Sequence, residues 1–309
     1  MSEPNQAAGA QDEDKRRRQA YLLLVALVLF WGVNWPVMKV AVTDIPPLWF
    51  AAFRLTLGAA SLFLLLAVTG RLALPRRADL AVIASVGLVQ MAFCLAVINI
   101  ALLYVPAGRS AVLAYTTPLW VAPAAAIVLG ERLTWRRIAG VGLGLAGLML
   151  LFEPASFDWS SRTALFGNGL LLASAAGWAL AIIHVRAHRW HGTPLALVPW
   201  QLLAGAVPLL VIAWCYHGWS SIHWTGRTAI ILAYNGPVTS GFCYWAVVEV
   251  VRRLPALSAS LAFLAVPCVG LASASLALGE AVHPALLGGF ALILGGLVLV
   301  ETGRARRPA

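Results

Sequence analysis

The sequence predicts an all-α membrane protein whose ten transmembrane helices form two five-helix repeats of opposite orientation. With 61% hydrophobic and 11% charged residues, the chain could not cover a soluble domain with polar groups. Its halves also match at an offset of 149 residues, where Pro106, Pro118, Gly130, Glu131, Gly140 and Gly147 correspond to Pro255, Pro267, Gly279, Glu280, Gly289 and Gly296. An internal repeat in an apolar chain favours a transporter.

Apolar stretches long enough to cross a bilayer, which takes about 20 helical residues, follow one another along the chain. The ten predicted helices cover residues 20–42, 46–69, 80–104, 107–129, 136–153, 165–186, 194–216, 228–250, 255–279 and 282–302. The first repeat therefore spans 20–153 and the second 165–302. Residues 1–19 are polar and predicted to be a disordered cytoplasmic tail, and 303–309 form a second cytoplasmic tail.

Basic residues predict that both termini are cytoplasmic. Of the 22 Lys and Arg residues, 17 fall in tails and loops on the side assigned to the cytoplasm: Lys15, Arg16, Arg17, Arg18, Arg71, Arg76, Arg77, Arg132, Arg136, Arg137, Arg186, Arg189, Arg252, Arg253, Arg304, Arg306 and Arg307. The outer loops hold only Arg162 and Arg227. This distribution follows the positive-inside rule. It explains the net charge of +10 by membrane orientation rather than by nucleic-acid binding, and it indicates a bacterial-type inner membrane.

An odd number of helices in each half makes the repeat inverted. Glu131 then falls on the cytoplasmic side and its counterpart Glu280 on the outer side. The first and sixth helices match at an offset of 147, where Trp31 meets Trp178 and Lys39 meets Arg186. Two halves with the same packing options can exchange conformations, which is the basis of alternating access. The alternative is a duplication that only built a stable bundle.

Several motifs resemble the EamA-type branch of the drug/metabolite transporter superfamily. They are Trp31-Gly32 with Pro36, Arg54, Tyr104-Val105-Pro106-Ala107 leading to Pro118, and Leu129-Gly130-Glu131-Arg132-Leu133-Thr134, repeated as Pro267 and Leu278-Gly279-Glu280. The resemblance covers roughly residues 20–302. It implies passage of small metabolites, often amino acids, through a central cavity. Bacterial aromatic amino-acid exporters share this pattern, as do threonine/homoserine, cysteine-metabolite and riboflavin transporters.

Candidate cavity residues are mostly aromatic, with a few polar groups. On the first helix Trp31, Asn34 and Trp35 share one face, which should turn inward because an unpaired amide in hydrocarbon is costly. The full set is Trp31, Asn34, Trp35, Gln90, Asn99, Tyr115, Thr116, Pro118, Trp178, His184, Asn235, Tyr244, Trp245, Ser260 and Pro267. Such a pocket suits a neutral or zwitterionic substrate with an apolar side chain, or an organic cation. Each residue taken alone is equally consistent with helix packing.

Charges close to the membrane suggest gates and an anchor. We expect two symmetry-related ion pairs, Lys39–Glu280 outside and Arg186–Glu131 inside, that close alternately; snorkelling cations are the alternative. Arg54 and Arg109 are embedded charges, and Arg54 needs a partner such as a carbonyl, Asp44 or a substrate carboxylate. No Asp or Glu lies at the centre of a predicted helix, which favours a facilitator over a proton-driven pump. His184 keeps proton coupling open.

The sequence thus predicts a transporter that exports, or facilitates the passage of, small amphipathic metabolites, with amino acids as the favoured class. The alternative is a multidrug or organic-cation exporter, with or without proton coupling. Nothing predicts an enzyme, a cofactor or a metal, and Cys94, Cys215, Cys243 and Cys268 have neither disulfide nor zinc spacing. The expected partners are a small-molecule substrate and membrane lipid. Glycines in the fifth and tenth helices fit a monomer or a weak homodimer.

Overall fold

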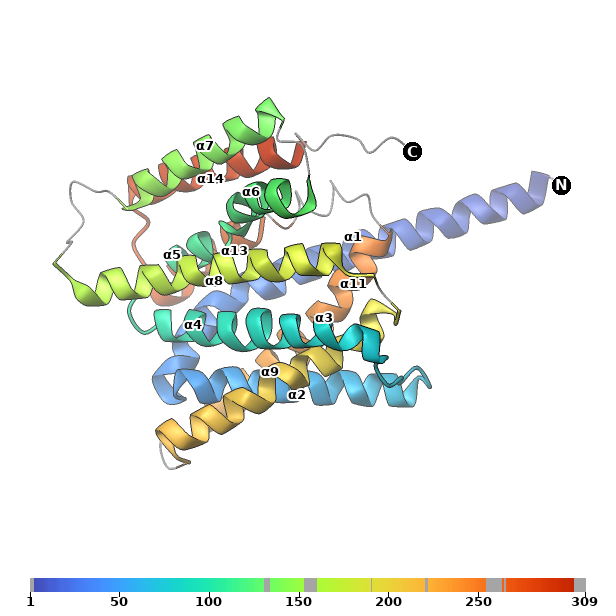
Figure 1. Cartoon of the computed structure of the whole chain (residues 1–309), viewed down its shortest axis with the longest axis horizontal. Coiled ribbons are helices and arrows are strands. Elements are labelled where there is room, and N and C mark those ends of the chain that lie inside the picture. The colour runs from blue at the N-terminus through green and yellow to red at the C-terminus, as the bar shows by residue number, and fades with distance from the viewer. Residues whose placement is uncertain are drawn as a thin grey trace.

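The computed structural model is a helical bundle, and it describes residues 3–130, 134–152, 160–189, 191–219, 222–253, 263 and 265–302. Every element in these ranges is helical (Figure 1). In the first repeat they are α1 (Glu3–Asp44), α2 (Pro47–Val68), η1 (Arg77–Asp79), α3 (Leu80–Ala84), η2 (Ser85–Phe93), α4 (Cys94–Ala101), α5 (Ala107–Ala114), α6 (Thr117–Leu129) and α7 (Trp135–Phe152). In the second they are α8 (Arg162–Ala187), α9 (Pro194–His217), α10 (Gly226–Ala233), η3 (Tyr234–Phe242), α11 (Cys243–Arg253), α13 (Ala265–Leu278) and α14 (Pro284–Thr302).

Six helical stretches are long and apolar enough to cross a membrane. They are Arg18–Asp44, Pro47–Val68, Arg77–Ala101, Ala107–Leu129, Arg162–Ala187 and Leu195–His217, and two shorter apolar helices cover Ala265–Leu278 and Pro284–Val300. The chain is therefore a multi-pass membrane protein, and the count of ten crossings stays a prediction. At the N-terminus, α1 begins at Glu3, so helix extends into the tail expected to be disordered. That tail is rich in Ala, Gln, Lys and Arg, which are good helix formers.

Both ends of the chain lie at the same end of the bundle. In Figure 1, α1 begins and α14 ends on the right-hand side, where the α2–α3 and α8–α9 connections also lie. We call this the terminal end. The α1–α2, α4–α5 and α9–α10 connections lie at the opposite end. The positive-inside pattern predicts that the terminal end is cytoplasmic.

The repeat is visible in an unusual detail of the third helix of each half. Both helices contain a π-helical segment, η2 over Ser85–Phe93 and η3 over Tyr234–Phe242, and the two segments lie 149 residues apart, which is the offset of the repeat. Long π-helical turns are rare and often mark functional regions. Pro237 inside η3 lacks a backbone N–H, which loosens the ordinary helical pattern there.

Glycines let the last helix of each half pack against its counterpart. A Cβ on Gly140 of α7 would lie 2.5 Å from the carbonyl oxygen of Gly296 on α14, and a Cβ on Gly147 would lie 2.6 Å from that of Gly289. The two contacts exchange under the 149-residue offset, as an inverted pair requires. These glycines therefore allow close helix packing within one chain.

The predicted helix over 107–129 is interrupted near its middle. α5 ends at Ala114 and α6 begins at Thr117, with Tyr115 and Thr116 between them. Pro118 occupies the first turn of α6, a position that proline favours because no backbone N–H is needed there. The break places a helix C-terminus and a helix N-terminus inside one span. Discontinuous helices of this kind are a common feature of transporter binding sites.

Candidate substrate site

Arg54 is a buried cation whose contacts with the described part of the chain are all neutral. It lies in the first half of α2 with only 4% of its surface exposed. Its guanidinium donates to Thr239 Oγ1 and Ser240 Oγ, each at 3.3 Å, and contacts Met38 Sδ at 3.0 Å. The ring of Phe50 lies 6.0 Å away, at the edge of cation–π range. A buried charge normally has an opposite charge as its partner, so this guanidinium has unused capacity for an anion.

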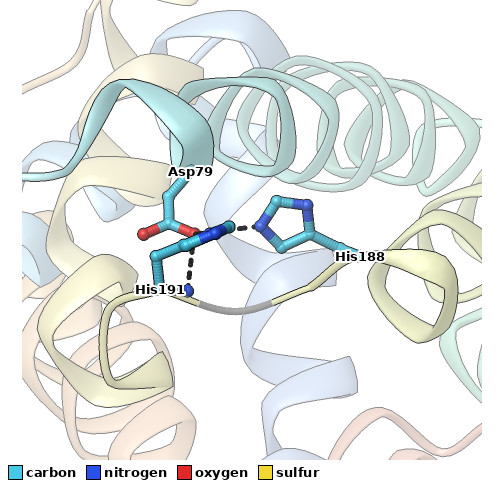
Figure 2. Close-up of side chains that lie close together, drawn as sticks. All are labelled: Asp79, His188 and His191. Atoms are coloured by element: carbon cyan, nitrogen blue, oxygen red, sulfur yellow. Dashed lines mark hydrogen bonds and ion pairs between the residues drawn. The ribbon is translucent and has the colours of Figure 1, made fainter.

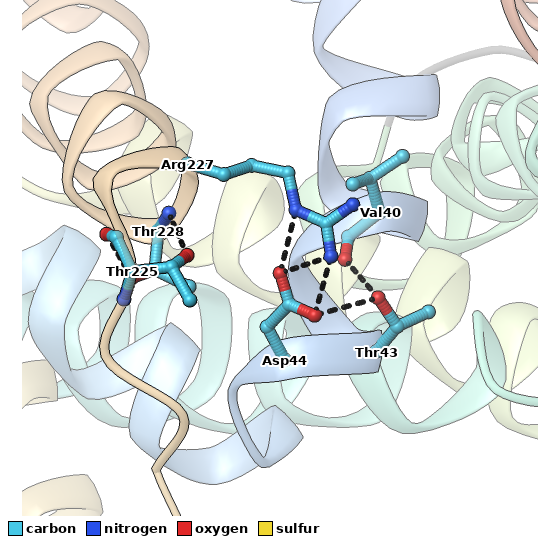
Figure 3. A network of polar contacts seen from close by, with 6 residues as sticks. All are labelled: Val40, Thr43, Asp44, Thr225, Arg227 and Thr228. Carbon is cyan, nitrogen blue, oxygen red and sulfur yellow. Dashed lines mark hydrogen bonds and ion pairs between the residues drawn. The ribbon is translucent and has the colours of Figure 1, made fainter.

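Asp44 was the acid that the sequence offered as a partner for Arg54, and it is engaged elsewhere. At the opposite end of the bundle Asp44 accepts two hydrogen bonds from Arg227, at 2.8 Å from Nε and 2.6 Å from Nη2 (Figure 3). Thr43 donates to the same carboxylate at 3.3 Å. Of the partners considered for Arg54, this leaves neutral protein groups and a substrate carboxylate.

Trp31 and Tyr244 lie beside this cation. The indole N–H of Trp31 donates to the carbonyl oxygen of Thr239 at 3.1 Å, and the ring of Tyr244 meets Trp31 edge-on with centroids 5.7 Å apart. Thr239 therefore contacts both Trp31 through its carbonyl and Arg54 through its hydroxyl. Trp31, Arg54 and Tyr244 come from α1, α2 and α11, so the site joins both repeats.

The other predicted aromatic residues, and Pro267, lie in buried apolar parts of the bundle. Trp178 of α8 packs, with Tyr244 and Trp245, against one buried apolar cluster. Tyr115, in the break between α5 and α6, packs against the cluster that also borders Trp31. Trp35 is buried against α13, where a Cβ on Gly270 would lie 3.0 Å from its ring. Pro267 is buried near the start of α13.

Most of the predicted polar residues bond to protein groups. Asn99 donates to the Pro47 carbonyl at 3.4 Å, Asn235 to that of Ile231 at 3.2 Å, and Thr116 to that of Leu113 at 2.7 Å. His184 Nδ1 lies 2.6 Å from Ser85 Oγ, and Gln90 is half-buried in η2. However, the amide oxygens of Asn34, Asn99 and Asn235 are buried without a hydrogen-bond partner among the described residues. Unpaired buried acceptors need an explanation, and a donor on a bound molecule would supply one.

The expected outer pair, Lys39 and Glu280, binds a shared loop instead of pairing directly. Glu280 accepts from the backbone N–H groups of Ala107 and Gly108 at 2.7 and 2.9 Å, which caps the start of α5. Lys39 donates to the carbonyl oxygens of Leu102 and Val105. Free backbone groups at helix ends compete well for charged side chains, and here they bind both Lys39 and Glu280. The direct Lys39–Glu280 gate pair therefore stays a prediction, with both charges bonded to backbone groups in this structure.

The other predicted charges are placed only in part. Arg186 is exposed near the end of α8, while its expected partner Glu131, like the cavity candidate Ser260, lies outside the described residues. Arg109 is half-buried in α5. The inner gate and the part that Arg109 plays therefore stay predictions.

Sequence reasoning missed two features of this arrangement. Met38 and Ser240 bind Arg54, and neither was singled out as its partner, because the contact depends on how η3 and α1 pack on α2. It also missed a cluster at the terminal end, formed by Asp79, His188 and His191. Asp79 lies more than a hundred positions from both histidines, so no local spacing could have revealed the cluster.

A comparison with known protein families matches one family model to each half of the chain. The EamA-like transporter family is matched at residues 18–153 and again at 165–302. The chain belongs to this EamA-like transporter family. Its two copies correspond to the two repeats of the bundle.

Relatives of this EamA-like chain are full-length matches. It is 30% identical to the uncharacterized transporter YoaV of Bacillus subtilis, over 92% of this chain and 97% of that protein. It is also 30% identical to a probable amino-acid metabolite efflux pump of Salmonella typhimurium, over 95% of this chain and 98% of that one. A protein crystal structure of 21% identity superposes with a TM-score of 0.66, covering 91% of this chain and 96% of that chain, and supports the fold alone. The chain is a membrane transporter of this family.

Proposed function

We propose that this EamA-like transporter moves small amphipathic molecules carrying a carboxylate across a bacterial inner membrane, with apolar or aromatic amino acids as the favoured substrates. One observation carries the proposal: among the described residues, the buried Arg54 guanidinium is held by neutral groups. A carboxylate is the anion that a guanidinium binds best, through two parallel hydrogen bonds. Similarity to a probable amino-acid metabolite efflux pump agrees with this class.

The surroundings of Arg54 suit the rest of an amino acid. Trp31 and Tyr244 offer aromatic surface to an apolar side chain. The unpaired amide oxygen of Asn34, on the helix that carries Trp31, is a suitable acceptor for an ammonium group. Substrate exchange between the two faces would follow from alternating access between the inverted repeats. In this proposal export and facilitated passage use the same site.

The alternative substrate class is an organic cation or drug. Aromatic walls could bind such a molecule, but the buried charge of Arg54 would repel it. The two classes therefore differ in the sign of the effect that Arg54 should have. Replacing Arg54 should strongly reduce transport of a carboxylate substrate and improve, or leave unchanged, transport of a cation.

The test is flux of labelled phenylalanine and of phenethylamine, which lacks only the carboxylate, into proteoliposomes. We expect phenylalanine flux to fall about 10- to 100-fold in Arg54→Gln, because a charge-assisted hydrogen bond contributes about 1.5–3 kcal/mol, and to recover in part in Arg54→Lys. The matched control is Gln201→Ala, which changes the repeat-related position on α9. Folding of each variant is checked by gel filtration in detergent.

A wild-type protein that carries phenethylamine as fast as phenylalanine, with neither flux changed in Arg54→Gln, would refute the proposal in favour of the cation exporter. Repeating the assay with and without a pH gradient separates proton-coupled transport from a facilitator. A facilitator should give flux that depends only on the substrate gradient.

A further inference from the structure

A cluster of three metal-ligating side chains lies at the terminal end of the bundle, away from Arg54. Asp79 ends η1 in the first repeat, while His188 and His191 follow α8 in the second (Figure 2). The Nε2 atom of His188 lies 3.0 Å from Asp79 Oδ1, and the Nδ1 atom of His191 lies 3.5 Å from the same oxygen. All three potential ligand atoms lie within 4.8 Å of one another.

We propose that Asp79, His188 and His191 form a binding site for a divalent transition-metal ion of the zinc type, with water as the fourth ligand. Bonds of about 2.0–2.1 Å to tetrahedral zinc put neighbouring ligand atoms roughly 3.3 Å apart. The distances from Asp79 Oδ1 to the two imidazole nitrogens fall on either side of that value. A small shift of the exposed His191 would therefore bring all three atoms into the coordination shell.

The carboxylate is held in place by backbone groups. The N–H of His191 donates to Oδ1 at 3.1 Å and that of Gly192 to Oδ2 at 2.8 Å. A Cβ on Gly192 would lie only 3.3 Å from Oδ2, so the glycine allows this close approach. Hydrogen bonds that orient a ligating carboxylate are typical of the outer shell of a metal site.

Exposure provides an entry path for the ion. The side chain of Asp79 is fully buried and that of His188 is 9% exposed, whereas His191 is 45% exposed. An ion can reach the cluster from the His191 side, where solvent also supplies the water ligand. Two rigid ligands and one accessible ligand match the open geometry of a three-residue zinc site.

The donor set selects the class of metal. Two imidazoles and one carboxylate suit zinc, cobalt, nickel or copper, whereas magnesium and calcium prefer sites made of oxygen. Arg186 and Arg189 are close neighbours in sequence, and their positive charge disfavours ions that bind by electrostatic attraction alone. The alternative is a purely structural role, in which Asp79 orders the α8–α9 connection by accepting hydrogen bonds from it.

The test uses the full chain, purified in detergent with a tag free of histidine and titrated with Co²⁺ and Zn²⁺. We expect one Co²⁺ per chain with the intense visible absorption of a site of low coordination number, displaced by Zn²⁺ and unaffected by excess Mg²⁺. Zn²⁺ should also raise the melting temperature, because a ligand that binds only the folded state stabilises it. The comparison titrations use His191→Gln, His188→Gln and, as a matched control at the opposite end, His223→Gln.

Loss of one ligand should weaken binding at least tenfold in His191→Gln and in His188→Gln, and His223→Gln should bind like the wild type. The exposed His191 keeps the test decisive even where a change at a buried position prevents folding. Wild-type protein that shows no cobalt spectrum up to millimolar Co²⁺, or equal affinity in His191→Gln, would overturn the site. Neither result bears on the Arg54 proposal, because transport plays no part in this measurement.

Discussion

The two repeats share their apolar packing and differ in their polar chemistry. Gly58 of α2 packs on η3, where its Cβ would lie 2.7 Å from Ser240 Cβ, and Gly205 of α9 packs on η2, where its Cβ would lie 2.7 Å from the Gly87 carbonyl oxygen. Gly58 and Gly205 lie 147 residues apart, the offset found for the first and sixth helices. Under the same offset, Arg54 corresponds to Gln201.

The difference indicates what each part of the duplicated unit is for. In the proposed alternating-access cycle, close helix packing would be kept in both halves because both would adopt the same set of arrangements. The proposed binding site would need no such symmetry, since one substrate would lie against both halves at once. Of this pair of equivalent positions, the one on α2 therefore carries the cation Arg54, while the one on α9 carries the neutral amide of Gln201.

The connections at the two ends of the bundle repeat this contrast. Asp44, the last residue of α1, pairs with Arg227 at the start of α10. Its equivalent at an offset of 147 is His191 in the α8–α9 connection, which contacts Asp79 at the start of α3. Both contacts join one repeat to the other, but the partner of the carboxylate is a permanently charged guanidinium at one end and a pair of imidazoles at the other. Among the described residues, the imidazole end is the one with the donor set proposed above for a metal ion.

Breaking the shared packing should have the largest effect. In Gly147→Leu the new side chain meets the Gly289 carbonyl oxygen and Ile293 on α14, and overpacking of this kind costs about 1–3 kcal/mol or more. The control is Gly142→Leu on the same helix, which has open space around its Cβ. We expect little folded Gly147→Leu by gel filtration in detergent and a normal yield of Gly142→Leu. Equal yields would contradict the close α7–α14 contact.

Reversing the charges at the opposite end should reduce transport by about tenfold or more, and should not be rescued. Because Lys39 binds carbonyl oxygens and Glu280 binds backbone N–H groups, neither charge can take the other's place on the loop. The double variant Lys39→Glu/Glu280→Lys should therefore be as defective as either single reversal in amino-acid flux. Restored flux would instead favour the direct ion pair that the sequence suggested.

The sequence predicts the fold far better than it predicts which residues contact one another within the site. Continuous apolar length predicts the span 46–69, observed as Pro47–Val68, because crossing a bilayer constrains both composition and length. Arg54 is conspicuous because charge is rare inside a span. Its partners Thr239 and Ser240 depend on how η3 packs on α2, which no local pattern encodes.

The same limit applies to the contacts of other charged residues. Opposite charges at one membrane face suggested that Lys39 and Glu280 bind each other, yet backbone groups near α5 lie closer to both. Asp79 and His188 are 109 residues apart, so only the tertiary fold brings them together. Residue type and periodicity predict which groups are unusual, and packing decides what they contact.

The smallest effect is expected for the Asp44–Arg227 ion pair at the opposite end of the bundle. Arg227 is 60% exposed, and an exposed ion pair contributes about 0.2–1 kcal/mol because solvent screens it. A double-mutant cycle with Asp44→Asn and Arg227→Gln, read from unfolding in detergent, should give a coupling in that range that shrinks as salt is raised. A coupling well above it, insensitive to salt, would mean that the opposite end is clamped as firmly as the buried contact around Asp79. The two ends would then be alike in strength although their chemistry differs.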